Sequence, residues 1–185
     1  MRKNFFILVI SFATASSVPA QKKKVHFQSI NQFAMVGGES QVNSAFQTLN
    51  GIKFSNWFSG IGVGIDNYHY KALPLFADAK WYFGDDKNGF LYGDIGYNFP
   101  LKNKPEKEIY YYDSYHFSGG IYTDLGIGYQ VRLYKKSYLL FSLGHSYKQL
   151  QIHTEIFATC GDCNTNRYDY KFSYGRMILK AGVMF

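Results

Sequence analysis

Two cysteines stand three positions apart in this chain of 185 residues, in the segment Cys160-Gly161-Asp162-Cys163. Two thiols at this spacing can close a short disulfide, remain free, or supply two of the four ligands of a zinc ion. Redox chemistry of the thioredoxin type needs a helix N-terminus beside the thiols, and no helix signal surrounds them. Zinc needs two further ligands, of which His153 is the nearest. The compartment in which the chain folds decides among these alternatives.

A second set of residues invites an esterase interpretation. His145 and Ser146 are adjacent, and His153 lies two positions before Glu155. A serine nucleophile needs a histidine within hydrogen-bond reach. Neighbouring residues of a strand point to opposite faces, so the adjacent pair does not form such a site. We therefore predict no catalytic, cofactor-binding or metal-binding residues and no enzyme activity.

The first twenty residues form a separate segment. Arg2 and Lys3 precede an apolar run over residues 5–10, and Val18-Pro19-Ala20 offers small residues for cleavage. This is the pattern of a secretory signal peptide, and the run is too short to span a bilayer. We expect a signal peptide over residues 1–20 and one domain over residues 21–185. In an exported chain the expected state of Cys160 and Cys163 is a disulfide.

Alternation with a period of two residues dominates the rest of the chain. Over residues 121–133 one parity is apolar apart from Thr123, and the other carries Asp124, Gln130 and Arg132 among glycines. Side chains of a strand alternate between faces, and 17 Tyr, 17 Phe and only 4 Pro also favour strands. The first two of the eight predicted strands alternate less cleanly, which a β-bulge would explain. The strands are expected near residues 26–36, 44–54, 60–66, 75–83, 91–99, 121–133, 139–148 and 176–185.

The predicted connections alternate in length. Short turns follow residues 54, 83 and 134, whereas residues 100–118 and 153–167 are expected to form long loops. Membrane barrels have short periplasmic turns and long extracellular loops, with aromatic girdles at both interfaces. Aromatic residues lie where such girdles would fall: Phe54, Trp57, Trp81, Phe83 and Phe185 near the short turns, and Tyr97, Phe99 and Tyr147 toward the long loops.

The chain resembles the eight-stranded outer-membrane barrels of the OmpA/OmpX type. The resemblance rests on the final strand, which ends at Phe185, and on the segments 60–66 and 73–78. In that family a terminal aromatic residue preceded by alternating apolar residues is read by the barrel-assembly machinery. The resemblance therefore implies an assembly signal made by Leu179, Ala181, Val183 and Phe185. It implies a fold and an outer-membrane location, but no activity.

A membrane barrel of this size would turn the polar parity inward, into a space that side chains fill. We expect an interior network of charges, because buried ions need partners. Its predicted members are Asp78, Lys80, Asp94, Asp124, Arg132, Arg176 and Lys180, with Asp66 and Lys148 on the same parity.

Together these observations predict an all-β fold, an up-and-down antiparallel eight-stranded transmembrane β-barrel. The expected function is that of an integral protein of the bacterial outer membrane with no open channel, whose long loops mediate adhesion or binding. Tyr110, Tyr111 and Tyr112 mark one such loop. Expected partners are outer-membrane lipid, the assembly machinery and an extracellular ligand or protein, with no cofactor and no nucleic acid. The alternatives are a lipid-modifying barrel enzyme and a soluble exported barrel that binds an apolar ligand, like a lipocalin.

Overall fold

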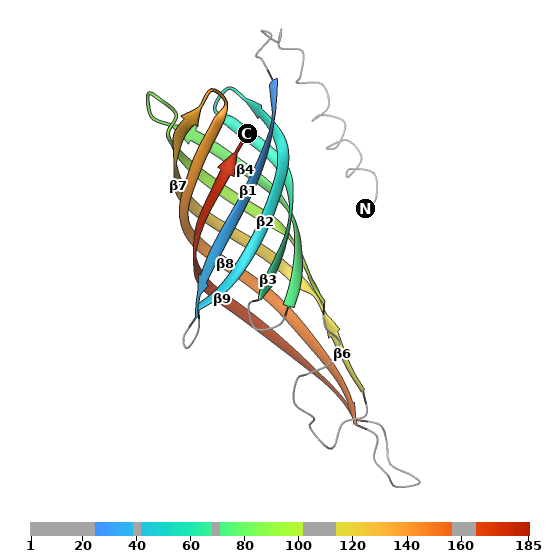
Figure 1. The fold of residues 1–185 in the computed structure, drawn as a ribbon. Helices are drawn as coiled ribbons and strands as arrows, with labels where there is room; N and C mark the ends of the chain where they lie inside the picture. Colours follow the sequence, from blue (N-terminus) through green and yellow to red (C-terminus); the bar gives the residue numbers. More distant parts are fainter. Residues whose placement is uncertain (1–24, 39–41, 68–70, 102–113, 157–165) are drawn as a thin grey trace, which may run out of the picture.

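The alternating segments form antiparallel strands in a computed structural model of the chain (Figure 1). The structure describes residues 25–38, 42–67, 71–101, 114–156 and 166–185. Among these residues, no helix is long and apolar enough to cross a membrane. The strands are β1 (Val25–Gly37), β2 (Val42–Phe54), β3 (Trp57–Asn67), β4 (Lys71–Phe83), β5 (Gly89–Pro100), β6 (Ser114–Ser118), β7 (Gly120–Tyr134), β8 (Ser137–Ile156) and β9 (Asn166–Met184).

The strands close into one barrel. Strands β1 to β5 pair in chain order, β5 pairs with β7, β7 with β8 and β8 with β9. β9 closes the sheet against β1, with Ile30 opposite Met184. Beyond the end of β9, the backbones of Ser29 and Phe185 exchange two hydrogen bonds of 2.9 and 3.0 Å. The eight-stranded, up-and-down antiparallel prediction is therefore confirmed.

Strands β6 and β7 together occupy one strand position in the barrel. Both pair with β8, and only Gly119 separates them. Ser118 lies opposite Gln151 and Tyr122 opposite Lys148, so four steps along β6–β7 match three along β8. The extra residue forms a bulge. A side chain at Gly119 would lie 1.9 Å from the carbonyl oxygen of Asn98, so this position accepts only glycine.

The two faces of the wall follow the predicted parity. In β4 the side chains of Phe76, Asp78 and Lys80 are buried, and those of Leu75 and Ala77 are exposed. The same alternation runs through β3, β5, β7, β8 and the second half of β9. This arrangement contradicts the lipocalin-like alternative, which would turn the apolar parity inward and the charges outward.

The faces of β1 and β2, which the sequence left unassigned, are now clear. The pairing between them runs without a step from Val25–Phe54 to Gly37–Val42, so no bulge interrupts it. In β1, apolar Ile30 and Val36 point inward while Phe33 points outward. Apolar side chains on both faces blur the alternation, and this explains the ambiguity without a bulge.

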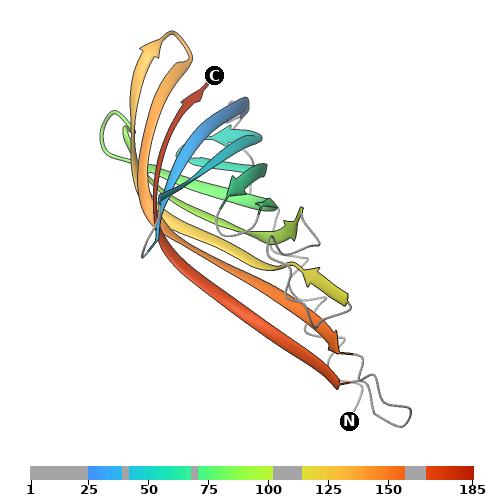
Figure 2. The same ribbon diagram turned by 60° about the horizontal axis from the view of Figure 1, so that its bottom comes forward.

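Strands β8 and β9 are much longer than predicted, at 20 and 19 residues. Their pairing continues to Ile156 opposite Asn166, although the pairing of β9 with β1 ends at Gly37 opposite Met177. With β6 they form a sheet that projects beyond the barrel, which we call the β-extension: β6, residues 149–156 and residues 166–175 (Figures 1 and 2). Residues 153–156 and 166–167 of the loop expected over 153–167, and residues 114–118 of the loop expected over 100–118, are therefore strand. Residues 157–165 and 102–113 lie outside the described residues.

Candidate functional site

The outer wall of the barrel is apolar. Exposed side chains on it include Ile61, Ile95, Leu125, Ile127 and Leu179, several more than half exposed. Along β7 the outward apolar residues span twelve steps, roughly 40 Å at the usual strand rise. At a tilt of about 40° the band is ~30 Å tall, which matches the hydrocarbon core of a bilayer. Such a wall is stable only against an apolar surrounding.

Aromatic side chains mark both ends of this wall. At the short-turn end, Trp57 packs on Trp81 with ring centroids 6.4 Å apart, and Trp81 packs on Phe83 at 5.8 Å. At the other end, the rings of Tyr97 and Phe99 lie 4.9 Å apart. These positions agree with the predicted girdles at the headgroup levels.

Large side chains fill the barrel between the short turns and its middle. The buried cluster consists of Ile30, Leu49, Phe58, Phe76, Tyr82, Phe90, Tyr92, Tyr122, Leu140 and Met184. Gly62 faces one of these rings, because a Cβ there would lie 2.4 Å from Cζ of Phe76. Small residues opposite large rings are what a filled interior needs.

A row of three carboxylates crosses the interior. Asp78 in β4 lies opposite Asp94 in β5, and Asp94 lies opposite Asp124 in β7. Like charges directly opposite each other repel, so the row needs cations. The ammonium of Lys180 reaches from β9 to Asp94 at 3.2 Å and to Asp124 at 2.7 Å, and Lys80 pairs with Asp78. All five residues are buried.

Further polar contacts extend this network. The hydroxyl of Tyr92 donates to Asp124 Oδ1 at 2.9 Å, and that of Tyr122 donates to Asp124 Oδ2 at 3.3 Å. Nearer the long-loop end, buried Lys148 pairs with Asp66. The interior is thus filled by aromatic side chains and by charged side chains that form ion pairs and hydrogen bonds with one another.

One predicted member of the network lies elsewhere, and another lies nearer the long-loop end of the interior. Arg132 is exposed near the end of β7, and its guanidinium donates to the carbonyl oxygen of Lys135 in the following turn. The prediction was wrong because Arg132 lies two residues from the end of β7, at the open end of the barrel, where its side chain is exposed to water. Arg176 is only partly buried, and its guanidinium carbon lies 5.8 Å from the ring of Tyr174.

The polarity of the wall reverses in the β-extension. On the face that continues the outer wall, Leu179 and Met177 of β9 give way to Ser173, Lys171 and Asp169. On the face that continues the interior, Lys180 gives way to three aromatic residues of the same parity, which are Tyr170, Phe172 and Tyr174. The reversal indicates that water replaces the apolar surrounding at the level of Gly175. This second alternation falls on residues 168–175, which were assigned neither to the loop expected over 153–167 nor to the strand expected from residue 176.

Polar contacts hold the outer face of the β-extension together. The imidazole of His153 in β8 lies 2.6 Å from the carboxylate of Asp169 in β9. The Tyr147 hydroxyl donates to Ser173 Oγ at 3.2 Å. His145 points to the outer wall and Ser146 is buried inside, so this adjacent pair does not form a nucleophile and base.

Other predicted residues are placed only in part. Leu179, Ala181, Val183 and Phe185 all lie on the outer wall at the end of the barrel strand that closes the sheet. Their role as an assembly signal stays a prediction. Residues 1–20, Tyr110, Tyr111, Tyr112, Cys160 and Cys163 lie outside the described residues.

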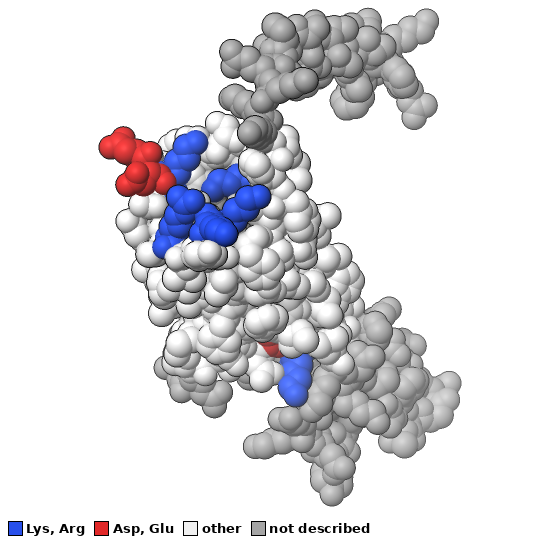
Figure 3. All heavy atoms as spheres, turned by 45° about the horizontal axis from the view of Figure 1, so that its top comes forward, with Lys and Arg blue, Asp and Glu red and all other residues white. Residues whose placement is uncertain are grey.

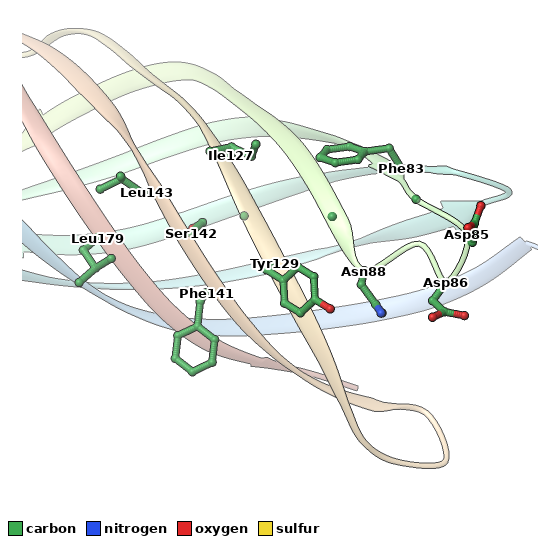
Figure 4. Close-up of a pocket in the computed structure, with 13 residues that line it drawn as sticks. Phe83, Asp85, Asp86, Asn88, Ile127, Tyr129, Phe141, Ser142, Leu143 and Leu179 are labelled. Carbon is green, nitrogen blue, oxygen red and sulfur yellow. The ribbon is translucent and has the colours of Figure 1, made fainter.

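Two surface features mark the short-turn end. An apolar hollow of about 700 Å³ lies on the outer wall between the β4–β5 turn and strands β7–β9, lined by Phe83, Ile127, Tyr129, Phe141 and Leu143 (Figure 4). Lys and Arg side chains also gather around this end (Figure 3). The strand ends and turns there carry Lys53, Lys87, Arg132, Lys135 and Lys136.

Comparison with solved structures gives the same fold. The outer membrane protein AlkL, solved in DMPC lipid bilayers, matches with a TM-score of 0.53 and 11% identity, covering 92% of this chain and 93% of AlkL. OprG, an outer membrane protein from Pseudomonas aeruginosa, matches with a TM-score of 0.52 and 13% identity, covering 88% of this chain and 96% of OprG. No protein-family model matches the sequence, and a search among curated proteins gave no match. The chain has the fold of the small eight-stranded outer-membrane barrels.

Proposed function

We propose that this chain is an integral protein of the bacterial outer membrane, a closed barrel that holds the β-extension outside the cell. The observation that carries the proposal is the reversal of polarity along β9, where one face is apolar up to Met177 and polar from Ser173. In a soluble barrel the whole outer face would meet water, and no such change from apolar to polar residues would be needed. The similarity in fold to AlkL and OprG supports the same location.

The barrel itself acts as a rigid support. The buried aromatic cluster and the ion pairs of Lys180 occupy the space through which solutes would pass. The cations around the short turns lie where lipid phosphates of the inner leaflet would be, and the hollow beside the β4–β5 turn suits an acyl chain. We also propose that the outward residues of β9 serve as the assembly signal, and that the chain is not an enzyme.

The β-extension is then the part of the protein that contacts molecules outside the cell. It carries half-exposed Tyr170 and Phe172 on one face and charged Asp169 and Lys171 on the other. Aromatic side chains beside polar groups are typical of binding surfaces. An adhesion or binding role follows from this position, with the barrel as its anchor.

Labelling of lysines in intact cells tests the topology. A membrane-impermeant amine reagent should modify Lys171 of the β-extension, and should modify Lys136 in the β7–β8 turn only after the outer membrane is permeabilised. Lys180, which is 2% exposed, should stay unmodified in both cases. Mass spectrometry of the purified chain reads all three sites. Modification of Lys136 before Lys171 would reverse the proposed orientation, and recovery of the chain in the soluble periplasmic fraction would exclude the membrane location.

A further inference from the structure

The β-extension has an edge with a partner on one side only. Strand β8 pairs with β9 over its whole described length, but β1 reaches only to Gly37, opposite Met177. Within the described part of the chain, residues 169–173 of β9 therefore have no second neighbouring strand. An edge with unpaired backbone groups is a template for pairing with another chain.

The hydrogen bonds at the end of β9 identify which residues serve this edge. Phe185 donates its N–H to Ser29 and accepts from Ser29 in return, so its backbone groups point away from β8. Every second residue of a strand points its backbone groups the same way. Along β9 these are the odd-numbered residues, and in the β-extension they are Asp169, Lys171 and Ser173.

The charges on this edge are complementary to those on the same edge of a second copy. If two copies pair antiparallel with Tyr170 at the centre, Asp169 of each copy lies opposite Lys171 of the other. Moving the centre by one residue, to Asp169 or to Lys171, places two identical charges opposite each other. Opposite charges across strands stabilise a pairing and like charges oppose it. The two Tyr170 rings, each 51% exposed in one copy, would then lie side by side.

We propose that the β-extension binds a second copy of this chain through residues 169–173 of β9, and that the two copies stand in facing membranes. Within one membrane both copies have the same orientation, so their β9 strands run in the same sense relative to the membrane normal. At a strand tilt of 35–45° two such strands cross at roughly 70–90°, which forms no ladder. Copies in membranes that face each other can run antiparallel. The interaction therefore joins cells, and it rests on the surface location proposed above.

Charge exchange tests the pairing. The full-length chain is expressed in two bacterial populations with different fluorescent labels, and mixed aggregates are counted by flow cytometry after surface amounts are matched. Wild-type cells should aggregate. Cells with Lys171→Asp, and cells with Asp169→Lys, should each lose aggregation because identical charges meet. A mixture of the two variants should regain the wild-type level in mixed aggregates, because both carboxylates of one variant then lie opposite the two ammonium groups of the other.

Two controls separate this pairing from damage to the β-extension. Asp169→Lys also removes the contact with His153, so His153→Gln should aggregate like the wild type. Ser173→Pro removes an N–H that points to the free edge and should abolish aggregation, whereas Ser173→Ala should not.

Each outcome decides the proposal. Two variants that fail both alone and in the mixture, or a wild type that reaches the surface without aggregating, would overturn the self-pairing and leave the membrane location intact. A chain that impermeant reagents do not reach at Lys171 would instead refute the location proposed for the β-extension.

Discussion

Lys180 is the cation on which the interior network depends most. It is 2% exposed, and its ammonium contacts Asp94 at 3.2 Å and Asp124 at 2.7 Å. Lys180→Met keeps most of the length of the side chain but leaves these two carboxylates opposite each other without that charge. Removing one partner of a buried ion pair costs about 3–5 kcal/mol. We therefore expect the free energy of unfolding to fall by about 3–5 kcal/mol, and Asp124→Asn in the same chain to recover part of this loss.

Urea unfolding from lipid vesicles measures the effect. Trp57 and Trp81 are both exposed on the outer wall, so their fluorescence reports departure from the bilayer. Lys171→Met is the matched control, because Lys171 is exposed and its replacement should change stability by less than about 0.5 kcal/mol. If Lys180→Met proved as mild as this control, the carboxylates would be solvated by water in an open lumen, and the filled interior would be refuted.

Four further predictions test other parts of the structure. Val183→Asp should reduce insertion, at a cost below the roughly 2–4 kcal/mol of a Lys or Arg at the bilayer midplane, whereas Val183→Leu should insert normally; equal insertion of both would contradict the lipid-facing position. Gly62→Val should destabilise the barrel by about 1–3 kcal/mol through overlap with Phe76, and Phe76→Leu should relieve part of the cost, as urea unfolding would show. Purified protein in planar bilayers should show no steady porin-like conductance, because side chains fill an eight-stranded interior. Changing Cys160 and Cys163 to Ser should leave insertion intact, since a loop this short gains less than the roughly 3 kcal/mol of a 15-residue loop; mass spectrometry of non-reduced protein should find no free thiols in the wild type.

Alternation, together with the lengths of the connections and the resemblance to small outer-membrane barrels, was enough to predict the barrel. Apolar and polar residues alternate wherever one face meets lipid and the other meets a polar interior, as in β4, where Leu75 points outward and Asp78 inward. This alternation fails where the interior face is apolar as well, and Ile30 and Val36 in β1 show this. The number of strands and the direction of most faces follow from the sequence for this reason.

The contacts within the interior could not be predicted in the same way. Parity placed Asp78, Asp94 and Asp124 on one face, but register decides that they lie directly opposite one another. The reach of Lys180 across the barrel to two of them depends on closure of the sheet, which no local pattern encodes. Arg132 was misassigned because parity alone does not tell how close a residue lies to the open end of the barrel, where inward side chains are exposed to water.

The β-extension was missed for a different reason. Its alternation of Tyr170, Phe172 and Tyr174 with charged or small residues is as regular as that of the barrel strands, but with the opposite polarity on each face. A search for strands with an apolar outward face does not recognise the reversed pattern. The reversal itself is the signal that could have located both the projecting sheet and the membrane boundary.

Spin labels along one face of β9 can show whether the barrel wall lies in lipid while the β-extension lies in water. In a Cys160→Ser, Cys163→Ser background, a single Cys is placed at Leu179, Ala181, Lys171 or Ser173, all of which face outward. In vesicles, labels at Leu179 and Ala181 should collide with dissolved oxygen and not with a water-soluble nickel complex, and labels at Lys171 and Ser173 should collide readily with the nickel complex. Equal access of the nickel complex to all four positions would contradict a membrane barrel with an extension in water.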